Sequence, residues 1–224
     1  NICDLNVSQW TIQRHIKRLG FVYKKAKKQI FLTKKHKEER SKLIREGITS
    51  NHPWEKTIFS DEKRFSLDGN DDWKSYMKDD QQIIHQKRVS DGGSIMVWMM
   101  MMPNNLLSHR VIEGKFNSEK YIKILKECTV PIIKLNYDED FYFQQDNSPI
   151  HTAKTINKFF ESSSIKVIKW PSRSPDINVI EDVWKMVSDI VYDGLQYQTK
   201  GDLKESINNA IMDINKCSRY KVQN

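Results

Sequence analysis

Three acidic residues stand where predicted strands or helices begin or end. Asp61 follows the apolar run 57–60, Asp146 follows the aromatic run 141–145, and Glu181 lies near the start of a predicted helix. Carboxylates are the ligands that Mg²⁺ prefers, and two such ions about 4 Å apart activate a water or hydroxyl for attack on a phosphodiester. Because each close pair of carboxylates costs about 4 kcal/mol without metal, a converging set has little purpose except to bind cations. Asp61, Asp146 and Glu181 are therefore the candidate catalytic and metal-binding residues.

Each of these acids also has a structural explanation. Asp61 resembles an acid in an exposed turn, and Asp146 could cap the helical segment that begins at His151. Glu181 fits a capping box with Asn178 as the N-cap residue, and a glutamate there is favoured by the helix dipole in any case. On residue types alone, the structural explanation is the stronger one for each acid.

Charge is distributed unevenly along the 224 residues, whose net charge is +8. Thirteen Lys and Arg lie between residues 14 and 46, against three Glu, while the rest of the chain is slightly acidic. A basic arm on a near-neutral body is typical of a nucleic-acid-binding protein, although a solvated helix face is the simpler alternative. The longest apolar run, 95–102, is too short to span a membrane. Three widely spaced Cys, with no Cys-x-x-Cys pair, favour a reducing compartment and argue against a zinc site or a disulfide framework.

The N-terminal part predicts a helix over residues 7–19. Ser8 is suited to N-capping, an apolar stripe of Ile12, Ile16 and Leu19 is expected to face a small core, and Gly20 closes the segment. This pattern fits the recognition helix of a helix-turn-helix and equally fits any short amphipathic helix. A basic segment follows, and a helix capped by Thr33 is expected from about residue 34 to 47. The residues expected to contact DNA are Gln9, Thr11, Gln13, Arg14, Lys17, Arg18, Lys24, Lys25, Lys27, Lys28, Lys34 and Lys35.

The remaining residues predict a mixed five-stranded α/β sheet flanked by helices. Strands are expected at 57–67 (broken or bent at Asp61), 73–77, 94–99, 141–145 and 165–170. Helices are expected at 118–135 (interrupted near Pro131), 151–162, about 180–191 and about 203–214. The first three strands would form an antiparallel meander, and right-handed crossovers would set the last two parallel to the first. This arrangement predicts that Asp61 and Asp146 lie on neighbouring strands.

Four ordered blocks make the chain similar to transposases of the Tc/mariner superfamily. They are Ile58-Phe59-Ser60-Asp61-Glu62-Lys63-Arg64-Phe65, Gly92-Gly93-Ser94-Ile95-Met96-Val97-Trp98, Phe143-Gln144-Gln145-Asp146-Asn147-Ser148-Pro149-Ile150-His151-Thr152, and the segment from Trp170 to Trp184. Asp146 and Glu181 are separated by 34 residues, which is the spacing of the Tc branch of that superfamily. The sequence departs from the family pattern at three positions: Met99 replaces a Gly, Val179 a Pro, and Asp182 an Asn.

The resemblance implies an RNase H-like catalytic domain with a DDE triad of Asp61, Asp146 and Glu181 at residues 51–224. It also implies a partial helix-turn-helix at 1–22 and a basic linker at 23–50, with the first DNA-binding subdomain missing from a chain that starts at Asn1. The family carries out cut-and-paste DNA transposition, in which the element ends are nicked by hydrolysis and the freed 3′-hydroxyl attacks target DNA. The corresponding expectations are two Mg²⁺ or Mn²⁺ ions per site, and a homodimer or higher oligomer on terminal inverted repeats and target DNA. Asn147 and His151 are expected to support the site, although a buried structural role is an equal alternative for His151. A nuclear location, with no membrane partner, is expected as well.

Two other functions remain open beside this one. A catalytically silent DNA-binding protein derived from a transposon would use the basic arm alone, but the three acids would then have no reason to persist. A host nuclease on the same fold is the other alternative, and the helix-turn-helix with its basic linker argues for binding at specific DNA ends instead.

Overall fold

The computed structural model describes residues 8–20, 31–49, 54–69, 93–136, 141–193 and 196–222. Residues 1–32 and 33–224 form two compact units, which are considered separately. The predicted strand at 73–77 lies outside the described residues. No helix in the described ranges is long and apolar enough to cross a membrane.

The first unit contains helix α1 (Gln9–Arg18). The hydroxyl of Ser8 accepts a hydrogen bond from the Thr11 amide at 3.3 Å, and Gly20 follows the helix with a φ of 81°, so both predicted ends are confirmed. The predicted burial of the apolar stripe is wrong, because Ile12, Ile16 and Leu19 are 44%, 45% and 64% exposed. Among the described residues of this unit there is no second helix that could cover the stripe.

A five-stranded sheet with the order β3-β2-β1-β4-β5 lies at the centre of the second unit. The strands are β1 (Thr57–Ser66), β2 (Ser94–Met101), β3 (Leu107–Ile112), β4 (Tyr142–Gln144) and β5 (Lys166–Val167). Strand β2 pairs antiparallel with β1 and β3, whereas β1, β4 and β5 are mutually parallel. The mixed five-stranded sheet and the parallel pairing of β1 with β4 are therefore confirmed.

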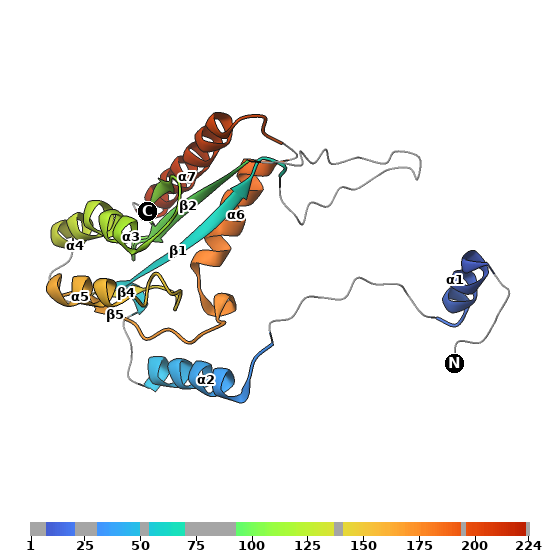
Figure 1. The fold of residues 1–224 in the computed structure, drawn as a ribbon, viewed down its shortest axis with the longest axis horizontal. Helices are drawn as coiled ribbons and strands as arrows, with labels where there is room; N and C mark the ends of the chain where they lie inside the picture. The colour runs from blue at the N-terminus through green and yellow to red at the C-terminus, as the bar shows by residue number, and fades with distance from the viewer. Residues whose placement is uncertain are drawn as a thin grey trace. The chain divides into compact units, whose positions relative to one another are not determined.

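Helices cover both faces of this sheet (Figure 1). One core cluster joins α6 (Ile180–Tyr192) and α7 (Lys200–Val222) to the sheet through residues such as Phe65, Met99 and Trp184. The other joins α3 (Ser118–Ile124), α4 (Val130–Asn136) and α5 (Lys154–Ser162) to it through Ile58 and Trp98. Because side chains of a strand alternate between faces, the continuous apolar run of β2 supplies both cores.

Several predicted boundaries need correction. The third strand of the meander is β3, which the sequence did not predict, and the last strand is only β5, Lys166–Val167. Helix α5 begins at Lys154, since residues 149–152 form turns. The predicted interruption near Pro131 is confirmed as a π-helical turn η2 (Leu125–Thr129), which joins α3 to α4. Proline lacks an amide hydrogen and crowds the carbonyl four residues earlier, so the wider turn accommodates it.

Helix α2 (Lys34–Thr49) belongs to the same compact unit as the sheet. The Thr33 hydroxyl accepts from the His36 amide, and His36 Nδ1 accepts from the Thr33 amide, both at 3.3 Å, which confirms the predicted cap. Its less exposed side chains include His36, Arg40 and Leu43, followed by buried Gly47. These positions are spaced by four, three and four residues and form one helical face. A Cβ on Gly47 would lie 2.7 Å from the Trp54 ring, so this glycine permits close packing of α2.

Candidate active site

Asp61 lies inside β1, where it is paired with Met99 of β2. Of the predicted break or bend at Asp61, the break is therefore wrong, because β1 pairs with β2 continuously from Phe59 to Ser66. Alternation along the strand places Asp61 with Phe65 on the face covered by α6, and places Glu62 on the opposite face. On the α6 face, Trp184 Nε1 donates a hydrogen bond to Asp61 Oδ2 at 3.0 Å. A residue that resembled a turn acid is thus held rigidly at the centre of the sheet.

The surroundings of Asp61 disfavour its charged form. Burial raises the pKa of the Asp61 carboxyl to about 7, and the negative charges of Glu62 and Glu181 contribute to the rise. The hydrogen bond from Trp184 lowers the pKa but does not compensate. Met99, the fully buried cross-strand neighbour, helps to exclude water from this carboxylate. A cation bound beside Asp61 would relieve both the desolvation and the repulsion.

Asp146 lies two residues beyond the end of β4, the parallel neighbour of β1. Its Oδ1 accepts hydrogen bonds from the Ser148 amide at 2.9 Å and from His151 Nδ1 at 2.6 Å. Burial alone would raise the pKa of Asp146, but these hydrogen bonds and the charge of His151 outweigh it, so the pKa lies below its usual value. Asp146 is therefore ionised and fixed in orientation before any ligand arrives.

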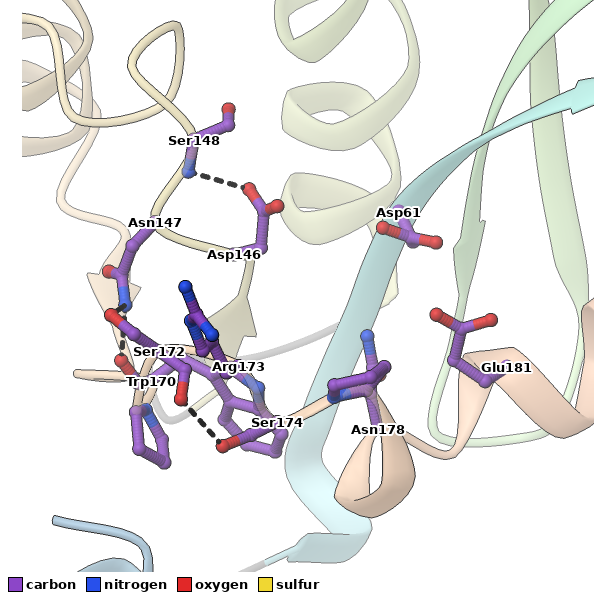
Figure 2. Close-up of a pocket in the computed structure, with 12 residues that line it drawn as sticks. Asp61, Asp146, Asn147, Ser148, Trp170, Ser172, Arg173, Ser174, Asn178 and Glu181 are labelled. Carbon is purple, nitrogen blue, oxygen red and sulfur yellow. Dashed lines mark hydrogen bonds between the residues drawn. The ribbon is translucent and has the colours of Figure 1, made fainter. Parts of the chain in front are cut away.

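Glu181 is the second residue of α6 and is exposed. The alternative explanation as a capping box is wrong, because the N-cap position is Val179 and has no side-chain cap hydrogen bond. The Asn178 side chain instead accepts from the Ile180 amide at 3.5 Å. Figure 2 shows Glu181 directed toward Asp61, with Asp146 on the other side of the same pocket.

These three acids line one pocket of about 390 Å³. The others that line it come mainly from the loop between β5 and α6, and the full set is Asp61, Asp146, Asn147, Ser148, Trp170, Pro171, Ser172, Arg173, Ser174, Pro175, Asn178 and Glu181. Oxygen ligands of this type suit Mg²⁺ or Mn²⁺. In the side-chain conformations seen, no group of three His, Cys, Asp or Glu within the described residues is close enough to hold a metal ion. The donor chemistry therefore fits a divalent cation, and side-chain rotation would be needed to close the site around it.

His151 joins Asp146 to a fourth acid that sequence reasoning missed. Its Nε2 lies 3.2 Å from Glu62 Oε1, and its side chain is only 2% exposed. Burial lowers the pKa of His151, but the bonds to Asp146 and Glu62 prevail and raise the pKa to about 9. The ring also packs against Tyr121 in a tilted arrangement, with centroids 4.4 Å apart and the planes at 38°, and the Tyr121 hydroxyl donates to Gln145 Oε1 at 2.8 Å. A buried imidazolium thus lies between the carboxylate of Glu62 on β1 and that of Asp146 just beyond β4.

Asn147 connects two segments that line the pocket. Its Nδ2 donates to the Trp170 carbonyl at 2.6 Å, which ties the end of β4 to the loop before α6. Asn147 thus contacts that loop, whereas His151 contacts Asp146 directly.

The predicted DNA-contacting residues are placed only in part. Thr11, Arg14, Lys17 and Arg18 are exposed on α1, and Lys34 and Lys35 are exposed on α2. Lys34 and Lys35 lie 4.0 and 3.9 Å from Glu38 and Glu39, distances at which exposed pairs bind weakly. Lys24, Lys25, Lys27, Lys28 and the side chains of Gln9 and Gln13 lie outside the described residues.

Comparison with known proteins places the chain in a family. Residues 56–204 match the family described as DDE superfamily endonuclease. The chain is 33% identical to the Tc3 transposase of Caenorhabditis elegans over 96% of its length and 66% of that protein, and 29% identical to the Tc1 transposase of the same organism over 80% of its length and 67% of that protein. It spans about two thirds of the length of these curated relatives.

Solved structures show the same fold at low sequence identity. A paired-end complex of the Mos1 transposase with its left transposon end superposes with a TM-score of 0.68 at 16% identity, covering 95% of this chain and 69% of that one. The Mos1 catalytic domain, solved with raltegravir and Mg, superposes with a TM-score of 0.56 at 13% identity, covering 85% and 94%. The sheet is accordingly RNase H-like, as predicted. With its residues 56–204 matching the endonuclease family and its similarity to Tc3 and Tc1, this chain belongs to the DDE superfamily endonucleases, in their Tc/mariner transposase branch.

Proposed function

We propose that this chain catalyses cut-and-paste DNA transposition: metal-dependent nicking at terminal inverted repeats, followed by transfer of the freed 3′-hydroxyl into target DNA. The observation that carries the proposal is the convergence of Asp61, Asp146 and Glu181 on one pocket of a protein in this family. The relatives Tc3 and Tc1 are transposases by name, and the Mos1 structures include complexes with transposon-end DNA.

The proposal includes two Mg²⁺ or Mn²⁺ ions per site. Mos1 paired-end complexes solved with Mn and with Mg support the choice of metal, and two ions are the number that phosphodiester chemistry of this kind uses. Bound ions of this kind supply activation of the attacking oxygen and stabilisation of the leaving oxygen. Asp61 and Asp146 would hold the ions, and Glu181 would complete the ligand set of one of them. The chain's own contribution is orientation: Trp184 fixes Asp61, and His151 with the Ser148 amide fixes Asp146.

The exposed basic residues of α1 and α2, together with the basic segment between them, would bind double-stranded DNA through its phosphates. We propose that the terminal inverted repeats and the target are its DNA partners, that it acts as a homodimer or higher oligomer, and that it works in the nucleus.

The direct test is nicking of a supercoiled plasmid that carries the inverted repeats flanking the protein's own gene, with Mg²⁺ or Mn²⁺. Nicking by the natural sequence is expected, with its loss in Asp146→Asn and unchanged DNA binding in that variant. Unchanged nicking by Asp146→Asn would overturn the site assignment. Tight binding without nicking by the natural sequence would favour the catalytically silent DNA-binding protein instead.

A further inference from the structure

The loop between β5 and α6 is joined to helix α2 by one arginine. Arg40 donates through Nη1 to Asp176 Oδ1 at 2.6 Å and through Nη2 to Asp176 Oδ2 at 2.5 Å. Its Nη1 also donates to the Arg173 carbonyl at 3.1 Å. The Arg40 side chain is 15% exposed, and these contacts span more than 130 residues of sequence. This bidentate guanidinium–carboxylate pair fixes the orientation of Arg40 relative to Asp176 as well as their distance.

Arg173 has an unusual backbone conformation at the point where Arg40 contacts it. Its φ is 56°, in the left-handed region that residues other than glycine seldom occupy. Such conformations persist where surrounding contacts impose them, and they concentrate at functional sites. Here Arg40 donates a hydrogen bond to the Arg173 carbonyl. It also binds Asp176 in the η3 turn (Pro175–Ile177), which begins two residues later, so Arg40 restrains the backbone at and just after Arg173.

The side chain of Arg173 lines the pocket that holds the three acids. Figure 2 shows it extending from the loop on the side of the pocket that also holds Asp146. Among the twelve residues that line this pocket, Arg173 is the one with a positively charged side chain. A guanidinium offers planar paired donors that match the oxygens of a phosphate, and it keeps its charge at any working pH.

We propose that Arg173 binds a DNA phosphate beside the bond to be cut, and that Arg40 is a positioning residue that holds Arg173 in place. This inference rests on the proposed function, because it assumes a phosphodiester substrate in the pocket. Arg40 thereby connects α2, which follows the basic segment proposed to bind DNA, to the loop that lines the pocket. DNA bound along α2 would thereby stabilise the loop conformation that presents Arg173.

The kinetic test uses the full chain and a supercoiled plasmid with Mn²⁺ under single-turnover conditions. Arg173→Ala is expected to nick about 100-fold more slowly, with Arg173→Lys recovering about tenfold, and the Mn²⁺ concentration for half-maximal rate is expected to stay within twofold. Arg40→Ala is expected to be about 30-fold slower. If Arg40 acts through Arg173, the double variant nicks no more slowly than Arg173→Ala alone. The proposal would be overturned if the double variant lost the product of the two single rate reductions, or if Arg173→Ala nicked at the normal rate.

Two further measurements do not depend on nicking. Binding of a mixed-sequence 12-bp duplex in Ca²⁺ should lose about one unit of salt dependence in Arg173→Ala and none in Lys204→Ala, an exposed control on α7. Hydrogen exchange of residues 172–176 should accelerate in Arg40→Ala but not in Lys42→Ala, which breaks the 3.6 Å pair with Glu46 on the same helix. Equal salt dependence in Arg173→Ala, or unchanged exchange in Arg40→Ala, contradicts the proposal. If the natural sequence fails to nick any plasmid, the proposed function fails, while these two measurements still decide the role of Arg173 and Arg40.

Discussion

Asp61 lies on β1, Asp146 lies just beyond the end of the parallel neighbour β4, and both line one pocket. The surroundings of the two carboxylates nevertheless shift their pKa values in opposite directions. On the Asp146 side, the buried His151 lies between Asp146 and Glu62 and lowers the pKa of Asp146. On the Asp61 side, burial and the neighbouring Glu62 and Glu181 raise the pKa to about 7. The negative charge of Asp146 is therefore compensated before a ligand binds, whereas that of Asp61 is not. The difference indicates that a cation entering the pocket would gain most from the Asp61 side.

The largest contrast is expected between Asp61→Asn and Asp146→Asn. Both variants should lose nicking by at least about 1,000-fold, because each removes a charged oxygen that the proposed site would offer to the metal. Their effects on the metal-free protein should have opposite signs. At pH 8, Asp61→Asn should raise the free energy of unfolding by about 1–2 kcal/mol, since it removes a desolvated charge. Asp146→Asn should lower it by about 1 kcal/mol, since it weakens a charge-assisted bond to His151 that is half exposed.

Chemical denaturation in EDTA, with circular dichroism as the probe, measures both differences. Lys204→Ala, an exposed change on α7, is the control for the effect of substitution itself. Stability changes of the same sign in the two Asn variants would remove the basis of the comparison.

Removal of the histidine should be the most destabilising change. His151→Ala leaves Asp146 and Glu62 without their shared cation in a site where the ring is 2% exposed, so a loss of about 3 kcal/mol is expected. Glu62→Gln should cost only about 1 kcal/mol, because the amide can still accept from Nε2. The double variant should lose less than the sum of the two, and strictly additive losses would show that the ring acts only as a packing group.

The pH dependence of metal-free stability should separate the two sides. Asp61 has a raised pKa, so its contribution is fully present below pH 4 and is lost as the pH rises through about 7. His151 also has a raised pKa, so its contribution is present below its ordinary value near 6.5 and is lost through about 9. Stability should therefore fall in two steps between pH 4 and 9, by roughly 2 kcal/mol for each group after allowance for solvent screening.

Thermal melts in EDTA at intervals of half a pH unit measure these steps. Asp61→Asn should remove the step below pH 7 alone, and His151→Ala the step above it. A single step that survives in both variants would assign the titration to other groups.

Local patterns predicted the elements with strong apolar periodicity and missed those shaped by distant partners. Strands β2 and β4 carry apolar or aromatic runs, and β1 has apolar residues on both sides of its charged stretch, whereas β3 carries Ser108, His109 and Arg110 and does not resemble a strand. It is an edge strand whose polar groups pair with α7: Asn215 bonds both backbone groups of Leu107, and Asn208 bonds His109. These contacts join residues 99 and 108 positions apart. No local pattern contains them.

The same distinction holds at the pocket. The resemblance to a family predicted Asp61, Asp146 and Glu181, and the geometry brings them to one pocket. The charged stretch from Asp61 to Arg64 looked like a break in the strand, but alternation lets its side chains serve opposite faces. Glu62 was missed because its partner His151 lies 89 residues away, and Arg40 because Asp176 lies 136 residues away. The sequence shows the residue types of such ion pairs, but it does not show which residues are paired across the fold.

The smallest effect on stability is expected at Glu181. It tests whether the negative charge of Glu181 adds to the repulsion at Asp61. Glu181 is exposed at the start of α6, and its charge is the third cause of the raised pKa of Asp61, after burial and Glu62. Glu181→Gln should therefore stabilise the metal-free protein at pH 8 by no more than about 0.5 kcal/mol, and less at high salt, because exposed charges are screened. Asp182→Asn removes a neighbouring exposed charge from the same first turn of α6, so it measures the helix-terminus contribution alone and should lower stability slightly. If Glu181→Gln destabilises the metal-free protein instead, the glutamate serves the helix terminus more than it repels Asp61, and the asymmetry between the two sides of the pocket would rest on burial and Glu62 alone.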